Sequence, residues 1–285
     1  MKKVLVTGGA GFIGTNLIKN LIKKEFEVVS LDDYSTGSIS NEINGVKYLK
    51  MDIEDIAEIK EKKFDICFHL AAQSRVQPSF EDPEESVRVN VLGTTRVLEW
   101  AKKNSVKVIY AGSSSKHHDP SDSPYAMTKY LGEEICKLYK KVFYVDVEIA
   151  RFYNVYGPFE PLDEKFGNVI GIWQVKAQRK LPLPIVGDGE QRRDFTHVFD
   201  IIDGIVKISE SDLKHKDAWE IGTGINYSIN DLFLMFKEKF NVDFENIPDQ
   251  KGNYRETLRI NDDLLSRLSW KPKDRLKEYI NKLTL

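Results

Sequence analysis

The stretch that decides the fold is residues 3–14, KVLVTGGAGFIG. Its apolar run, residues 4–6, has the β-rich character expected of a buried strand. Four glycines follow at once, and apolar residues then recur at helical spacing: Gly8, Gly9, Gly11 and Gly14, then Ile13, Leu17, Ile18, Leu21 and Ile22. A strand, a glycine turn and a helix predict a diphosphate-binding unit, because glycine lets the backbone approach closely and the helix N-terminus offers unpaired N–H groups. The alternative is an ordinary glycine-rich turn, which the flanking elements disfavour.

The end of the second predicted strand completes this pattern. Residues 28–31 form the strand, which ends at Asp32 and Asp33, and Asp32 comes 18 residues after Gly14. An acid at this place accepts hydrogen bonds from the adenosine ribose hydroxyls and repels a 2′-phosphate. No Arg or Lys follows before Lys47. The sequence therefore predicts NAD rather than NADP, with Asp33 equally interpretable as a solvated turn residue.

The whole chain narrows the class of protein. Its 285 residues suffice for one large domain or two, and 42 Lys and Arg against 44 Asp and Glu give a formal charge of −2. We expect no nucleic-acid partner from this balance, and no apolar run has the length of a membrane span. The first strand begins at residue 3, which leaves no room for a signal peptide. Cys67 and Cys136 lack metal-ligand spacing, so we expect reduced core residues, no metal and a cytoplasmic protein.

Strands and helices alternate along the first half of the chain. Further strands are predicted at residues 46–50, 66–70, 106–111 and 145–150, with a helix over 84–103. The third strand leads into Asp52 and Ile53, and the fourth ends at Ala71 and Ala72, where small residues let a cofactor lie against the backbone. His69 reads as a packed strand residue. This alternation predicts an α/β fold of Rossmann type, a doubly wound parallel sheet.

The candidate chemistry follows the fifth strand. Ser113 and Ser114 come directly after it, at the edge where open α/β sheets bind ligands. Ser123 suits a helix N-cap, with Pro124 at the first helical position. The spacing then places Tyr125 in the first turn of a helix and Lys129 one turn later on the same face.

These residues suit proton and hydride transfer. A tyrosine has an ordinary pKa of about 10, and a base working near neutrality needs this pKa lowered by about 3 units. A nearby ammonium, the positive nicotinamide ring and the helix N-terminus all favour the phenolate. Ser113 would hold a substrate hydroxyl while Tyr125 takes its proton and hydride passes to NAD. Tyr-x-x-x-Lys alone is common and carries little weight without the dinucleotide pattern.

Together these motifs resemble the extended short-chain dehydrogenase/reductase family. The likeness extends over nearly the whole chain and is greatest to its NAD-dependent nucleotide-sugar epimerase and dehydratase branch, whose type member is UDP-galactose 4-epimerase. The motifs that carry it are residues 7–14, 69–72, Asn90, 113–114, Tyr125 with Lys129, 151–158, 187–189, 193–195, Arg255 and 268–272.

The resemblance implies a role for each matching residue. The catalytic residues would be Ser113, Tyr125 and Lys129. The cofactor would contact Gly8, Gly11, Phe12, Ile13, Gly14, Asp32, Asp33, Asp52, Ile53, Leu70, Ala71, Ala72, Tyr125 and Lys129. The nucleotide-sugar substrate would contact Ser113, Ser114, Tyr125, Asn154, Arg193 and Arg255. Arginine suits a diphosphate because its guanidinium binds bidentately, although a surface salt bridge is the alternative for each one.

The same resemblance implies the domains and the assembly. Residues 1–156 would form the NAD-binding domain, to which 196–225 return, and 157–285 would form mainly a smaller C-terminal α/β substrate domain. Ser228 reads as an N-cap within it. Two helices of the large domain would pair with their copies in a homodimer, with apolar area from Val87, Val91, Leu98, Leu131, Ile135 and Leu138, although core packing would use the same residues.

Two departures from the family pattern bear on the reaction. Dehydratases and decarboxylases of the family carry a Glu two residues after the catalytic Ser or Thr, where this chain has Ser115. The loop 116–122 is also short and lacks the usual Val-Tyr-Gly, so the sugar pocket is more open or shaped for another substrate. His117 and His118 in this loop would contact substrate, shuttle a proton or remain solvated.

We therefore expect an NAD-dependent nucleotide-sugar 4-epimerase that acts through a transient 4-keto sugar, with Tyr125 as acid and base. The alternative is an NAD-dependent nucleotide-sugar dehydrogenase or ketoreductase that uses the same site. Dehydration and decarboxylation are disfavoured by Ser115. A non-catalytic NAD-binding scaffold is disfavoured because Ser113, Tyr125 and Lys129 are all present.

Overall fold

The structure is a computed structural model that describes residues 1–61 and 63–284. Its centre is a seven-stranded sheet in the order β11-β6-β5-β4-β1-β2-β3, in which every neighbouring pair is parallel. The strands are β1 (Lys3–Thr7), β2 (Glu27–Asp32), β3 (Lys47–Lys50), β4 (Ile66–His69), β5 (Lys107–Ser113), β6 (Val147–Phe152) and β11 (Trp219–Ile221). The predicted doubly wound parallel sheet is confirmed.

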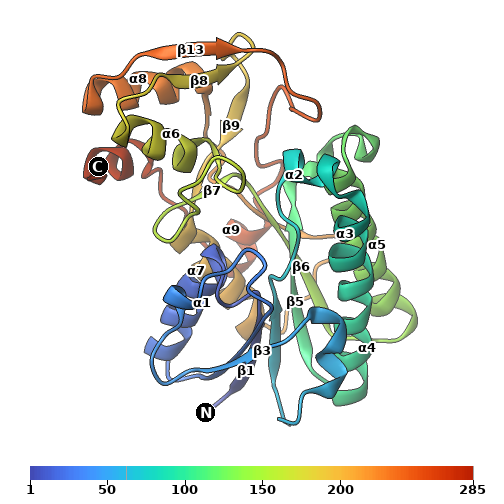
Figure 1. Ribbon diagram of the computed structural model, residues 1–285. Coiled ribbons are helices and arrows are strands. Elements are labelled where there is room, and N and C mark those ends of the chain that lie inside the picture. The colour runs from blue at the N-terminus through green and yellow to red at the C-terminus, as the bar shows by residue number, and fades with distance from the viewer. Residues whose placement is uncertain (62, 285) are drawn as a thin grey trace.

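Helices cover both faces of this sheet (Figure 1). α1 (Phe12–Lys23) and α7 (Val198–Glu210) pack on one face, where Leu17 and Ile201 are fully buried. α4 (Thr94–Asn104) and α5 (Pro124–Val142) pack on the other, where Leu98 and Cys136 are fully buried. Each strand of the sheet centre is apolar on both sides for this reason.

The helix expected over 84–103 is divided. α2 (Val76–Glu81) and α3 (Pro83–Val87) precede a wider π-helical turn, Arg88–Gly93, which leads into α4. The wide turn contains Asn90, whose side-chain amide donates to the Gln73 carbonyl at 3.0 Å and to the Thr128 hydroxyl at 3.0 Å. Hydrophobic spacing predicts that this segment is helical. It does not predict the wide turn, which coincides with the contacts of Asn90 to Gln73 and Thr128.

The turn after β1 lies where the order of the sheet reverses, between β2 and β4. Gly8 has φ +72°, and a Cβ there would lie 2.9 Å from the Ala71 nitrogen. The backbone N–H of Gly8 donates to the Leu31 carbonyl at 2.8 Å. Only glycine therefore fits between the ends of β2 and β4, and the first turn of α1 opens directly onto the switch point.

A smaller lobe follows in the C-terminal half and caps the carboxyl edge of the sheet (Figure 1). Three strand pairs belong to this half: β8 (Leu183–Val186) with β13 (Phe244–Ile247), β9 (Arg192–Asp194) with β12 (Asn226–Ser228), and β7 (Val155–Tyr156) with β10 (Thr196–His197). Its helices are α6 (Val169–Gln178), α8 (Ile229–Phe240) and α10 (Leu276–Lys282). Trp173, Phe233 and Phe236 are the centre of its core.

Local signals explain two helix starts. Ser228 accepts from the Asp231 N–H at 2.9 Å and forms a reciprocal capping box, as its predicted N-cap role requires. Ser123 accepts from the Ala126 N–H at 3.1 Å and caps α5. After β13 the chain returns to the sheet, because α9 (Asp263–Leu268) and Trp270 pack into the core beside α7. Short 3₁₀ turns complete the described elements at Ile39–Asn41, Ile53–Glu58, Ser114–His117 and Pro120–Asp122.

Candidate active site

A cavity of about 820 Å³ lies between the carboxyl edge of the sheet and the smaller lobe. Most of the residues predicted to contact cofactor or substrate line it: Gly8, Gly11, Phe12, Ile13, Gly14, Asp32, Asp33, Ile53, Leu70, Ala71, Ala72, Ser113, Ser114, Tyr125, Lys129, Asn154 and Arg193. The structure thus brings together, in one cavity, residues that stand far apart in the sequence.

The glycine-turn end of the cavity fits a dinucleotide. The first-turn N–H groups of α1, at Phe12, Ile13 and Gly14, have no partner within the helix and lie along the cavity. Asp32 ends β2, and its carboxylate accepts from the Ala10 N–H at 2.8 Å and the Tyr34 N–H at 2.8 Å. Burial raises the pKa of Asp32, and these two N–H groups oppose that rise.

Two acids near this end are placed differently from Asp32. Asp33 is exposed at the rim and accepts from the Ser35 N–H and hydroxyl, as a turn residue does. Asp52 is absent from the cavity lining: it caps a 3₁₀ turn through the Glu54 N–H and pairs with Arg88 at 2.9 Å. The resemblance to the family predicts a cofactor contact for Asp52, and in the structure the arginine holds its carboxylate.

The end of the cavity that holds the predicted catalytic residues is built by β5 and α5. Ser113 is the last residue of β5, and the Tyr125 hydroxyl in the first turn of α5 donates to its Oγ at 3.1 Å. The Ser115 hydroxyl also donates to Ser113 Oγ, at 2.9 Å. One turn along α5, Lys129 Nζ donates to the Ala111 carbonyl at 2.5 Å and lies 4.5 Å from the centre of the Tyr110 ring. The predicted trio therefore meets at the carboxyl end of β5.

The electrostatics of this end differ from the expectation. Burial raises the pKa of Tyr125 above its ordinary value, and the hydrogen bond with Ser113 and the charge of Arg75 only partly oppose the rise. Burial also lowers the pKa of Lys129 to about 8. The protein's own groups therefore do not supply the lowered phenol pKa that we predicted, because desolvation outweighs the nearby cations.

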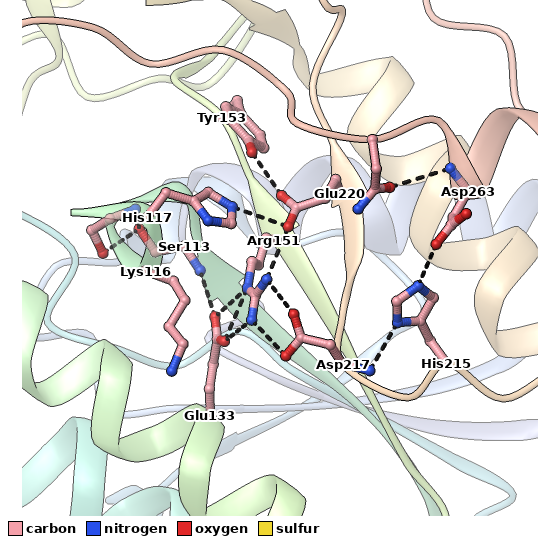
Figure 2. Close-up of polar contacts among 12 residues, drawn as sticks. Ser113, Lys116, His117, Glu133, Arg151, Tyr153, His215, Asp217, Glu220 and Asp263 are labelled. Atoms are coloured by element: carbon pink, nitrogen blue, oxygen red, sulfur yellow. Dashed lines mark hydrogen bonds and ion pairs between the residues drawn. The ribbon is translucent and has the colours of Figure 1, made fainter.

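A buried ionic network lies behind Ser113 (Figure 2). The Arg151 guanidinium of β6 donates to Glu133 of α5 at 2.7 and 3.0 Å, and to Glu220 of β11 at 2.9 Å. It also donates to Asp217 at 2.7 Å. Glu133 in turn accepts from the Ser113 N–H at 3.4 Å. The network therefore ties the helix that carries Tyr125 to the strand that carries Ser113.

The smaller lobe contributes three predicted substrate residues. The Asn154 amide donates to the Thr257 hydroxyl at 2.7 Å and lines the cavity. Arg193 lines it as well, and burial lowers its pKa to about 10. Arg255 does not line this cavity: it pairs with Asp188 at 2.8 Å on the surface and faces a smaller adjoining cavity with Ser114 and the two histidines. For Arg255 the structure thus shows the surface salt bridge that was the alternative.

The short loop 116–122 is packed rather than solvated at its histidines. His117 Nε2 lies 3.0 Å from Glu220, and the His118 ring stacks on Tyr254 with ring centres 3.9 Å apart. His69 is a buried strand residue between Thr7 and Thr94, as expected. Sequence reasoning missed two residues that line the cavity, Arg75 and Tyr254, and it missed Glu133, which lies behind Ser113. The one available signal was the position of Glu133, one helical turn after Lys129.

The structure shows no candidate metal cluster and no candidate membrane-spanning helix among the described residues. Within residues 1–61 and 63–284, no group of three or more His, Cys, Asp or Glu side chains is arranged to hold a metal ion. No helix among the described residues is both long and apolar enough to span a membrane. Both cysteines are buried and free.

Comparisons with known proteins agree with this geometry. The model of the NAD dependent epimerase/dehydratase family matches residues 4–222. A putative UDP-glucose 4-epimerase of Methanocaldococcus jannaschii is 35% identical, over 98% of this chain and 96% of its own. UDP-glucuronic acid decarboxylase 1 of Arabidopsis thaliana is 27% identical, over 99% of this chain and 68% of its own. The crystal structure of a UDP-glucose 4-epimerase of Thermotoga maritima with UDP-glucose has a TM-score of 0.89 at 28% identity, over 98% of this chain and 96% of that one.

Proposed function

Because this chain belongs to the NAD-dependent epimerase/dehydratase family, whose cofactor is NAD, we propose that it is a nucleotide-sugar 4-epimerase. The observation that carries the proposal is the contact of 3.1 Å between the Tyr125 and Ser113 hydroxyls, in the cavity that the glycine turn also lines. A proton acceptor and a hydroxyl-binding group therefore lie together next to a dinucleotide site.

The side chains have distinct tasks in this proposal. Ser113 holds the 4-hydroxyl of the sugar, and Tyr125 removes its proton and later returns one. The chemistry that a bound NAD would supply is reversible acceptance of a hydride from C4, which would give a transient 4-keto sugar. Lys129 donates to the Ala111 carbonyl, and this hydrogen bond fixes its ammonium group at the carboxyl end of β5. Asn154 and Arg193 are the groups that we assign to the substrate diphosphate.

The side chains around Ser113 favour epimerisation over the other reactions of the family. No Asp or Glu among the described residues hydrogen-bonds to the Ser113 or Tyr125 hydroxyl, and Ser115 stands where a dehydratase needs its carboxylate. Glu133 is near but points to Arg151 on the far side of Ser113. The site therefore has a group for the 4-hydroxyl proton and none placed for the proton at C5.

The assembly and the location belong to the same proposal. Leu131 and Leu138 of α5 and Val87 of α3 are exposed apolar residues, which suits the homodimer that we propose through these helices. Leu98 is unsuited to such an interface because it is fully buried in the core. Two free, buried cysteines suit the reducing cytoplasm that we propose.

The test is an incubation of the purified protein with UDP-hexoses, UDP-N-acetylhexosamines and UDP-hexuronates, without added cofactor. We expect the C4 epimer of at least one of them, with NAD retained and no net reduction. A keto sugar formed with stoichiometric NADH as the only product would instead establish a dehydrogenase. Activity that is unaffected by Tyr125→Phe would refute the assigned chemistry.

A further inference from the structure

Arg75 is a cation inside the cavity that has no carboxylate partner. It precedes α2, is half-buried, and lines the cavity together with Ser113 and Tyr125. Its Nε donates to the Phe166 carbonyl at 2.6 Å, which holds the guanidinium in place. Among the described residues, no Asp or Glu oxygen lies within 4.0 Å of it, and neither Nη1 nor Nη2 has a hydrogen-bond acceptor. Both terminal nitrogens are therefore available to a ligand.

Other arginines of restricted exposure in the described part of the chain are paired with carboxylates, except Arg193, which lines the same cavity and is the one that we assign to the substrate diphosphate. Arg88 contacts Asp52, Glu54 and Glu85, and Arg151 contacts three carboxylates. Arg275 pairs with Asp200. A cation taken partly out of water without a counterion is unfavourable, and burial does lower the pKa of Arg75. An unpaired arginine at the wall of a binding cavity is explained when the ligand brings the negative charge.

The position of Arg75 shows which part of the ligand it faces. Arg75 directly precedes α2, and Ser79 of that helix accepts from the Tyr125 N–H at 3.1 Å, so Arg75 lines the cavity at the end that holds Tyr125. The first-turn N–H groups of α1 would hold the diphosphate of NAD, and we assign the substrate diphosphate to Arg193 and Asn154. Arg193 donates to Asn253 at 2.5 Å and comes from β9, a different wall of the cavity. Neither diphosphate accounts for the cation beside Tyr125.

We propose that Arg75 binds a carboxylate on the sugar itself, so that the substrate is a nucleotide hexuronate rather than a neutral nucleotide hexose. The two free terminal nitrogens match the two oxygens of a carboxylate in a bidentate pair. This proposal rests on the proposed function, because that function places the sugar between Ser113 and Tyr125. It makes Arg75 a residue that determines specificity.

Arg75 has two alternative roles, balancing a buried carboxylate or holding NAD, and substitution of Arg75 distinguishes them from substrate binding. Two carboxylates beyond 4.0 Å, Glu160 and Asp163, still favour the charged form of Arg75, and Glu160 is buried and accepts from Gln174 at 2.8 Å and Tyr279 at 2.9 Å. If Arg75 only balanced that charge, its loss would lower the melting temperature and leave sugar selectivity unchanged. If it held NAD, its loss would lower the NAD content of the purified protein.

The experiment is calorimetric titration of the NAD-loaded protein with UDP-glucuronate and with UDP-glucose, for the natural protein, Arg75→Gln and Arg193→Gln. We expect the natural protein to bind UDP-glucuronate at least about 10-fold more tightly than UDP-glucose. Arg75→Gln should lose about 10-fold or more in affinity for UDP-glucuronate and change within about 3-fold for UDP-glucose. Arg193→Gln should weaken both ligands alike, and Arg75→Lys should keep part of the preference.

Equal affinity of the natural protein for the two ligands overturns the proposal, whether or not the variants fold. So does an Arg75→Gln variant that weakens both ligands equally, melts earlier with unchanged selectivity, or loses its NAD. The proposed function fails separately, when no UDP-sugar yields its C4 epimer. If the protein epimerises UDP-glucose and shows no preference for UDP-glucuronate, the proposed epimerase function holds and only the proposed hexuronate specificity is refuted.

Discussion

The Tyr125 hydroxyl is the atom on which the proposed chemistry depends. Burial raises its pKa, and the opposing groups are Ser113 and Arg75. Lys129, the cation expected beside it, donates to the Ala111 carbonyl instead. The protein alone therefore keeps the phenol protonated at neutral pH, and the positive nicotinamide ring is the further charge that favours the phenolate.

Removal of this hydroxyl tests its role directly. Tyr125→Phe should lower kcat by about 10²- to 10⁴-fold, the usual contribution of a general acid and base. The NAD content of the purified variant reports separately on the cofactor contact that the resemblance implies for Tyr125. Tyr144→Phe is the matched control, because Tyr144 is 88% exposed and far from any predicted role. Steady-state kinetics with the best UDP-sugar give the comparison, and an equal kcat for both variants would contradict the assignment.

The burial of Glu160 predicts how the stability of the protein depends on pH. Burial raises its pKa from 4.5 to about 7. The folded protein therefore keeps a proton that the unfolded chain has lost between about pH 4.5 and 7, and stability falls as the pH rises through this range. Glu160→Gln should raise the free energy of unfolding at pH 8 by up to about 3 kcal/mol, and this gain should vanish below pH 4.5.

Urea denaturation at several pH values measures this difference. The control is Glu164→Gln, because the Glu164 side chain is 52% exposed and its pairs with Lys176 and Arg179 are surface pairs. The difference in free energy of unfolding between Glu160→Gln and the natural protein should be larger at pH 8 than at pH 4. An equal difference at the two pH values would show that Glu160 does not titrate in this range.

Single residues mark the limit of what the sequence predicts. Ser113, Tyr125 and Lys129 are found from local signals, because a strand end and a helix start bring them together. Arg75 depends on Phe166, 91 residues away, and Arg255 on Asp188, 67 residues away. Such partners are set by the packing of the two lobes. Residue types and spacing alone therefore do not show whether an arginine is paired.

At the level of elements, Arg151 joins β6, α5 and β11. Arg151 is 2% exposed and is the permanently charged partner of two buried carboxylates, Glu133 and Glu220, whereas Asp217 is 49% exposed and also pairs with Lys137. Through Glu133, which accepts from the Ser113 N–H, the network fixes α5 against β5. The distance between the two reacting hydroxyls therefore depends on an ion cluster outside the cavity.

Loss of this cation should be costly. Arg151→Met leaves buried carboxylates uncompensated and should lower the free energy of unfolding by about 3–5 kcal/mol. Lys137→Met is the control: Lys137 pairs with Glu134 and Asp217 but is 30% exposed, so its loss should cost at most about 1 kcal/mol. Urea denaturation at pH 7 measures both, and similar costs would contradict a structural role for the buried network.

The elements themselves were mostly predictable, for physical reasons. The start of α5 follows from Ser123 and Pro124, and the start of α8 from the capping box at Ser228. Six of the parallel strands follow from apolar runs that end in small or polar residues. The break at Arg88–Gly93 does not, because it coincides with Asn90 bridging Gln73 and Thr128. Hydrophobic spacing is similar on the two sides of such a break.

For the whole molecule, the cavity exists because the smaller lobe covers the carboxyl edge of the sheet. The helices α3 and α5 lie side by side along one side of the large domain (Figure 1). Val87, Leu131 and Leu138 are 49%, 37% and 50% exposed. Exposed apolar side chains gathered on neighbouring helices are typical of an interface between copies of one chain.

The proposed dimer gives a prediction at this scale. Leu131→Glu combined with Leu138→Glu should convert the dimer into a monomer, because charges would then be buried at the interface. Leu234→Glu, on the exposed face of α8, should leave the dimer intact, although Leu234 is 62% exposed. Sedimentation velocity distinguishes the species. A natural protein that sediments as a monomer at micromolar concentration would rule this interface out.

The most direct test of the central claim follows the hydrogen at C4. The protein is incubated in ordinary water with the UDP-sugar that it epimerises best, labelled with deuterium at C4, and the product is analysed by NMR and mass spectrometry. We predict that the C4 epimer keeps its deuterium, because the hydride leaves and returns within one closed site. Loss of the label to solvent would contradict the account, since the proton taken by Tyr125 would then come from carbon and not from the 4-hydroxyl.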